Sequence, residues 1–214
     1  MPNHWHFKEE VSILSAKREI YNLRRTLGLP NHRGLEDIWY TIWNIRLSRF
    51  VRKCRSLVVG PQRVVSHEQV DQDGRVRKES RIPDFALLRV FRKRLRLNGM
   101  DFERMKIVAL MELKPCPMNS ELNSIYGAIK EAKADLNDQA EVLFSGNPEY
   151  KAIVGVAIAG DWWSYEKAAE DYVSPLRLRP IYQLLTPQSD AAMKAMTEEI
   201  KQLPGFEKYA NTQF

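Results

Sequence analysis

The chain has little cysteine and no long hydrophobic run, and both shortages exclude classes of protein. Its two cysteines, Cys54 and Cys116, give no disulfide framework and no zinc-ligand spacing. The longest apolar run, residues 153–159, is far shorter than the ~20 residues that cross a bilayer. The first ten residues lack the apolar core of a signal peptide. We therefore expect an intracellular protein of the cytoplasm or nucleus that has no membrane partner.

Linkers and repeats are missing as well. No internal repeat, low-complexity tract or Pro/Gly/Ser-rich stretch divides the 214 residues, and 44% hydrophobic with 28% charged residues is ordinary globular usage. We expect a single domain over 1–214, with an N-terminal helical extension at 1–34, a core at 35–185 and a C-terminal helix at 186–214.

Acidic residues are too few in the first half of the chain to balance its basic residues, 12 against 23. Residues 1–107 have a net charge of +11, whereas residues 108–214 have −5, which gives +6 overall. The positive excess is mostly arginine, whose planar guanidinium matches phosphate. This imbalance favours a polyanionic partner, most of all nucleic acid. The alternative is a solvated cationic face without a partner.

Hydrophobic spacing predicts helices and strands in an order typical of a mixed α/β protein. The expected helices lie at 9–27, 35–51, 120–145 and 189–203. The expected strands lie at 56–59, 62–67, 81–90, 106–114, 150–159, 162–165 and 177–185. This order predicts layers of helices around one central sheet.

Charged residues interrupt the apolar faces of two expected strands. Strand alternation gives shared faces made of Ile82, Asp84, Ala86 and Leu88 in 81–90, and of Val108, Leu110, Glu112 and Lys114 in 106–114. Charges are costly on a buried face unless they are paired or bind a metal. Two such strands, close in sequence, predict one shared site.

Strand register decides whether the two acids meet. A two-residue turn at Asn98-Gly99 places Asp84 and Glu112 on opposite faces. A three-residue loop, 97–99, with Gly99 in the left-handed position, places Asp84 directly across from Glu112. Paired residues lie ~4.5–5.5 Å apart between Cα atoms, close enough for their carboxylates to share a divalent cation. Ligation by oxygen alone suits Mg²⁺ or Mn²⁺.

Pro83-Asp84, followed after a strand and a turn by Glu112-Leu113-Lys114, resembles the PD-(D/E)XK nuclease superfamily over roughly residues 35–185. The resemblance implies a restriction endonuclease-like αβββαβ core, in which helices flank a mixed central sheet, with extra helices at both ends of the chain. It implies metal-dependent hydrolysis of phosphodiester bonds, most often in DNA. The alternative is a catalytically inactive nuclease fold that binds nucleic acid or serves as an accessory subunit. The sequence does not decide whether the protein forms a homo-oligomer.

The resemblance also implies roles for individual residues. Asp84 and Glu112 would hold Mg²⁺ (or Mn²⁺), with the carbonyl of Leu113 as a further ligand. Lys114 would orient the attacking water or offset negative charge in the transition state.

Two helical residues match further positions of the superfamily. Gln139 falls in the apolar stripe of helix 120–145 and would be directed at the site; the alternative is a glutamine that bonds backbone or water. Glu36, at the start of helix 35–51, would be an extra metal ligand. Its alternative is an acid that simply suits the positive end of the helix dipole.

A basic run follows the first of the two motif strands. It consists of Arg89, Arg92, Lys93, Arg94 and Arg96. A hairpin that grips phosphate and a nuclear-localisation-like patch are both compatible with it, and so is a solvated hairpin.

Overall fold

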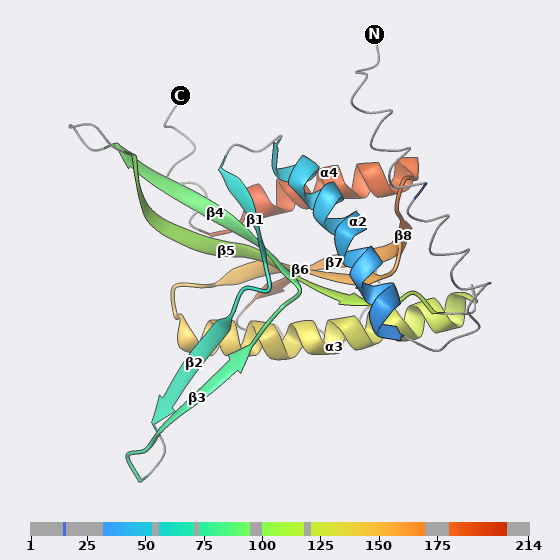
Figure 1. Cartoon of the computed structure of the whole chain (residues 1–214). Helices are drawn as coiled ribbons and strands as arrows, with labels where there is room; N and C mark the ends of the chain where they lie inside the picture. The colour runs from blue at the N-terminus through green and yellow to red at the C-terminus, as the bar shows by residue number, and fades with distance from the viewer. Residues whose placement is uncertain are drawn as a thin grey trace.

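Helices cover both faces of a mixed sheet (Figure 1). The computed structural model describes residue 15 and residues 32–52, 56–70, 73–94, 100–117, 121–169 and 180–204. The described helices are α2 (His32–Arg52), α3 (Leu122–Gly146) and α4 (Pro187–Lys201). The described strands are β1 (Leu57–Pro61), β2 (Val65–Val70), β3 (Val76–Arg81), β4 (Phe85–Arg94), β5 (Met100–Lys114), β6 (Ala152–Ala159), β7 (Trp162–Ala169) and β8 (Tyr182–Gln183).

The main sheet combines antiparallel and parallel pairs. Among the described strands its order is β1-β4-β5-β6-β7-β8, and only β5 and β6 run parallel. Helix α3 connects this pair, as a parallel crossover requires. The expected α/β class with a mixed central sheet is confirmed. The helix expected at 9–27 lies outside the described residues apart from Ser15.

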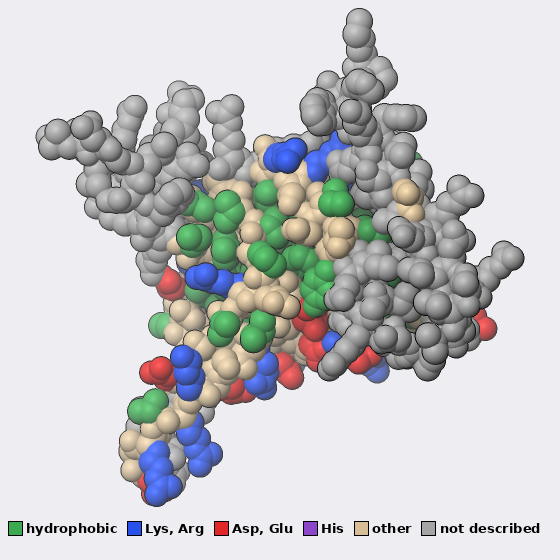
Figure 2. All heavy atoms as spheres, in the orientation of Figure 1, with side chains coloured by type: hydrophobic (Ala, Val, Ile, Leu, Met, Phe, Trp, Pro, Cys, Tyr) green, Lys and Arg blue, Asp and Glu red, His purple; other side chains and the backbone are tan. Residues whose placement is uncertain are grey.

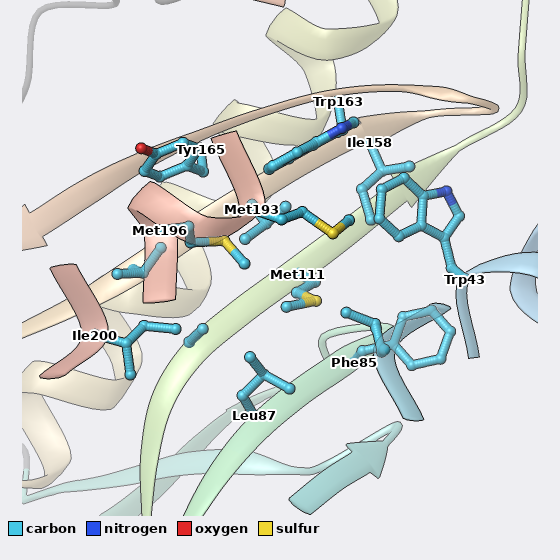
Figure 3. Close-up of a cluster of buried hydrophobic side chains, with 14 of the residues drawn as sticks. Trp43, Phe85, Leu87, Met111, Ile158, Trp163, Tyr165, Met193, Met196 and Ile200 are labelled. Carbon is cyan, nitrogen blue, oxygen red and sulfur yellow. The ribbon is translucent and has the colours of Figure 1, made fainter. Parts of the chain in front are cut away.

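Each face of the sheet has its own apolar core. On one face, α3 packs through most of the stripe that the helical period predicted: Ile125, Ile129, Ala132, Leu136, Ala140 and Leu143. Leu122, expected at the start of the stripe, is exposed instead. On the other face, Trp43 of α2 and Met193 of α4 pack in one cluster with side chains of the central strands, including Met111 and Trp163 (Figure 3). All eight residues of β6 are buried, because this strand has cover on both faces. Within the described ranges, no helix has the length and apolar character needed to cross a membrane.

The strand expected at 81–90 is wrong at its start. Residues 76–81 form β3, which pairs with β2 in a separate two-stranded sheet, and β4 begins at Phe85. The break contains Pro83, which has no backbone N–H to contribute to a ladder. The last expected strand, 177–185, is also too long, because β8 is restricted to Tyr182–Gln183 within the described part.

The hairpin of β4 and β5 reaches the expected register by an unexpected route. Phe85 pairs with Met111, so extending the ladder by one pair places Asp84 opposite Glu112. The three-residue loop at 97–99 is wrong, because Arg94 pairs with Met100. Two one-residue bulges in β5, at Glu103 and Val108, shift the pairing between the hairpin's outer end and the site.

The second bulge changes which face one residue occupies. Val108 packs in the same cluster as its neighbour Ala109, on the side of α2 and α4, whereas Leu110 packs against α3. The shared face expected for Val108 and Leu110 is therefore wrong. Alternation is regular from Ala109 onward, and Glu112 and Lys114 contact α3 as Leu110 does.

Candidate active site

Glu112 is the buried centre of a polar cluster between β5 and α3. Its side chain is on the apolar α3 side of the sheet, and the residue is only 9% exposed. Oε1 accepts a hydrogen bond from Nζ of Lys114 at 3.1 Å, and Oε2 accepts one from Nε2 of Gln139 at 2.7 Å. A buried carboxylate needs such partners to offset the loss of hydration.

Gln139 is held in this cluster by the period of α3. It lies three residues after Leu136, within the buried stripe, and is 4% exposed. The structure therefore places its amide nitrogen at Glu112. Its Oε1 is buried and has no hydrogen-bond partner within the described residues. Such an atom is costly unless something outside the protein pairs with it.

Asp135 joins the cluster, and the sequence analysis missed it. It precedes Gln139 by one helical turn, and its Oδ2 accepts a hydrogen bond from Nζ of Lys114. The ammonium of Lys114 is thus bracketed by two carboxylates from β5 and α3. The only sequence signal was the i,i+4 spacing from Gln139, since Asp135 is half exposed and resembles an ordinary solvated acid.

Asp84 lies just before β4 begins and is hydrogen-bonded to the neighbouring strand β5. Its Oδ2 accepts the backbone N–H of Leu113 at 2.6 Å, and its Oδ1 accepts the hydroxyl of Tyr40 in α2. Strand N–H groups point along the plane of a sheet. The Asp84 carboxylate, which accepts one of them, therefore lies near that plane, beside β5 and next to the first residue of β4. Tyr40 was also missed, because a half-buried aromatic residue in an apolar helix stripe resembles core.

The two acids therefore have different surroundings. Glu112 contacts side chains from α3, whereas Asp84 contacts α2 and the backbone of β5. Within the described residues, no three His, Cys, Asp or Glu side chains form a group that could hold a metal ion. A divalent cation here would depend on these two carboxylates, with water or substrate oxygens completing its shell, as Mg²⁺ commonly requires.

Burial and hydrogen bonds set the protonation of the cluster. Burial raises the pKa of Glu112 above its usual range, although Gln139 and Lys114 act in the opposite direction. Burial also lowers the pKa of Lys114, but the hydrogen bond to Asp135 and the charge of Glu112 outweigh it and raise that pKa overall. Lys114 is therefore an ammonium at neutral pH, a donor for an anionic oxygen.

The structure says less about the two other predicted metal ligands, Glu36 and Leu113. Glu36 lies in α2 one turn before Tyr40, but its side chain is outside the described part of the structure. Leu113 is buried in β5 and pairs with Ile158, and its role as a carbonyl ligand stays a prediction.

The basic run from 89 to 96 is mostly outside the described side chains. Arg92, Lys93 and Arg94 belong to β4 by their backbone, and Arg96 lies outside the described residues altogether. Arg89 is described, and it is buried with 6% exposure. A buried guanidinium does not present itself to a phosphate at the surface, so we leave Arg89 out of the proposed nucleic-acid interface.

Comparison with known proteins adds no relative. No family model, no curated protein and no solved structure matches this chain. Any function therefore has to be argued from the site itself.

Proposed function

We propose that this chain is a metal-dependent nuclease that hydrolyses phosphodiester bonds, most of all in DNA. The observation that carries the proposal is the cluster around Glu112, in which Lys114 and Gln139 both bond to a buried carboxylate next to the strand position of Asp84. The element order α2, β1, β4, β5, α3, β6 supports it, because it follows the αβββαβ order of the PD-(D/E)XK resemblance.

The donor set fits a hard divalent cation. Asp84 and Glu112 would hold Mg²⁺ or Mn²⁺, and the buried Oε1 of Gln139, which has no partner among the described residues, is a further oxygen at this site. When bound, the cation supplies Lewis-acid polarisation of the scissile phosphate and charge stabilisation.

The remaining chemistry belongs to the side chains. The ammonium of Lys114 donates hydrogen bonds to an anionic phosphate oxygen or to the attacking water, which stabilises the negative charge that develops in the transition state. Gln139 orients Glu112 and, through its free oxygen, a water molecule. The carboxylate of Asp135 keeps the Lys114 amine at the end of β5.

A second candidate is a nuclease fold that binds nucleic acid without cleaving it. One observation favours it: each carboxylate oxygen of Asp84 and Glu112 already accepts a hydrogen bond from a protein donor. A site that is satisfied internally has less need of a cation.

Cleavage assays separate the two candidates. Purified protein is incubated with labelled single-stranded, double-stranded and branched DNA, and with RNA, in the presence of Mg²⁺, Mn²⁺ or EDTA. The nuclease proposal requires metal-dependent products that disappear with Lys114→Met. Salt-sensitive binding without any product on the whole panel would favour the second candidate and reject the first.

A further inference from the structure

The hairpin of β2 and β3, which we call the arm, stands apart from the main sheet. Figure 1 shows it extending from the body of the molecule beyond the end of α3. All six residues of β3 are exposed, whereas Val65 at the base of β2 is 2% exposed. The base is fixed at α3, where a Cβ on Gly146 would lie 2.7 Å from the carbonyl oxygen of Ser66. The arm is thus anchored at one end and solvated along β3.

The base of the arm lies next to Asp84 of the candidate site. Gln62, just before it, donates its backbone N–H to the carbonyl oxygen of Asp84, just after it, at 2.9 Å. Arg81, the last residue of β3, precedes Asp84 by three residues. The base of the arm is therefore hydrogen-bonded to the backbone of Asp84, the residue whose carboxylate we assign to the metal.

Positive charge dominates the second strand of the arm. Four of the seven residues from 75 to 81 are basic and one is acidic, and that acid, Glu79, pairs with Arg81 at 2.9 Å. The other acids of the hairpin precede this strand: Glu68 on β2 lies opposite Lys78, and Asp71 and Asp73 lie between the two strands in the sequence. The four basic residues are thus gathered in 75–81, whereas three of the four acids lie before it. Figure 2 shows lysine and arginine side chains towards the tip of the arm. Arg75, Arg77 and Lys78 are all exposed.

The side of the arm that faces α3 is rich in acidic side chains. A pocket of about 190 Å³ between them is lined by Glu79 from β3 and by Asp138 and Glu141 from α3. These acids repel phosphate from the pocket itself. A polyanion on the arm therefore follows the tip and β3, and Arg81 is less useful to it because it lines the same pocket.

We propose that the arm is a grip for the phosphate backbone of double-stranded nucleic acid, formed by Arg75, Arg77 and Lys78. The inference rests on the proposed function, because it assigns the arm to the substrate of that site. Six strand residues span ~20 Å, comparable to several successive phosphates along a duplex, and the major groove admits a two-stranded ribbon. Contacts of this kind position a duplex without reading its sequence.

Binding in EDTA tests the grip separately from cleavage. A fluorescent DNA duplex is titrated with wild type, with the triple variant R75A/R77A/K78A, and with a control, K130A/K151A/K194A. The control removes the same charge from exposed lysines outside the arm. We expect the arm variant to bind at least tenfold more weakly and to flatten the slope of log K against log[salt] by about 2–3, at ~0.9 per lost phosphate contact. The control should retain most of the affinity.

Several outcomes would overturn the grip. These are equal losses in both triple variants, no loss in the arm variant, no binding by wild type, or equally strong competition by polyglutamate, which would indicate a general anion surface. The single variant Lys78→Glu, with its far-UV spectrum compared with wild type, guards against a folding artefact and should also weaken binding. Wild-type cleavage in Mn²⁺ distinguishes the two proposals. Cleavage with an unimportant arm rejects only the grip, and arm-dependent binding without cleavage rejects only the nuclease.

Discussion

The carboxylate of Asp84 accepts the backbone N–H of Leu113 at 2.6 Å, which ties the first acid of the motif to the main chain between Glu112 and Lys114. Because the donor is a backbone group, the position of Asp84 relative to β5 does not depend on any side chain of that strand. The bond also distinguishes the structural role of Asp84 from its proposed metal role, since an amide oxygen can replace the acceptor but not the negative charge.

Asp84→Asn and Asp84→Ala should therefore behave differently. Asparagine keeps an acceptor for Leu113 N–H, so we expect near wild-type stability, a loss of cleavage of ~10²-fold or more, and weaker Mn²⁺ binding. Alanine leaves the buried N–H unpaired, which should cost about 1–3 kcal/mol of unfolding free energy in addition. Urea unfolding and initial cleavage rates measure the two effects. Full activity of Asp84→Asn would reject Asp84 as a ligand.

Tyr40→Phe tests whether α2 orients the same carboxylate. The substitution removes the hydroxyl that donates to Asp84 and keeps the ring, which lies 5.4 Å from that of Phe85 between centroids. Outer-shell donors of this kind typically contribute 10–100-fold to metal affinity, so we expect Mn²⁺ to bind about tenfold or more weakly. Isothermal titration measures this. Unchanged affinity would limit Tyr40 to packing.

Lys114→Met should separate catalysis from binding. The variant retains the length of the side chain and loses the ammonium that contacts Glu112 and Asp135. We expect cleavage to fall by ~10²-fold or more while duplex affinity in EDTA changes little, because one electrostatic partner of the transition state is lost. If duplex affinity falls as much as the rate, Lys114 is a binding residue and not a catalytic one.

Asp135→Asn tests whether α3 positions that amine. A displaced Lys114 should reduce kcat by between tenfold and ~10²-fold with little change in KM, because misplacement affects the transition state more than substrate binding. Asp138→Asn, on the exposed side of the same helix, removes an equal charge and should leave kcat near wild type. Equal effects of the two substitutions would indicate a general electrostatic influence of α3. Asp135→Glu should restore part of the loss.

Burial of Glu112 should make stability depend on pH. The pKa of Glu112 is raised in the folded protein above the 4.5 expected for the unfolded chain. At a pH between the unfolded and the folded pKa, the native protein therefore binds more protons than the unfolded chain. Stability of wild type relative to Glu112→Gln should therefore fall as pH rises from 4.5 through the raised pKa, and then level off. Urea unfolding in EDTA at a series of pH values measures the difference. A difference that rises over this window would contradict the assigned direction.

Periodicity predicted two members of the site, because Glu112 and Gln139 each interrupt an apolar row of a regular element. Asp84 was predicted from a strand at 81–90 that in fact begins at Phe85, so its row of apolar neighbours was only partly right. Tyr40 and Asp135 were not predicted, since an aromatic residue among apolar ones and an acid on a solvated helix face are each ordinary. Their roles depend on tertiary contacts between elements far apart in the chain.

The register of β4 and β5 was right at the site for an incomplete reason. A loop of three residues gave the correct pairing at Phe85 and Met111, yet the outer ladder is offset from it by two residues. The bulges at Glu103 and Val108 bring the ladder back to the pairing expected at the site. Neither glutamate nor valine is a residue type that marks a bulge in a sequence. The separate β3 was missed because its residues lack the apolar alternation by which half-buried strands are recognised.

The bulge at Val108 coincides with the place where β5 leaves the central sheet. From Ala109 to Met111 β5 pairs with both β4 and β6, whereas the residues before Val108 pair, among the described strands, only with β4. A one-residue deletion or insertion on the outer side can therefore be absorbed at Val108 or Glu103 without turning Glu112 and Lys114 to the other face. The outer part of the β4–β5 hairpin can therefore change in length and sequence during evolution without moving these two residues. Changes in the outer hairpin and changes in the part of β5 that carries Glu112 and Lys114 can therefore be selected independently.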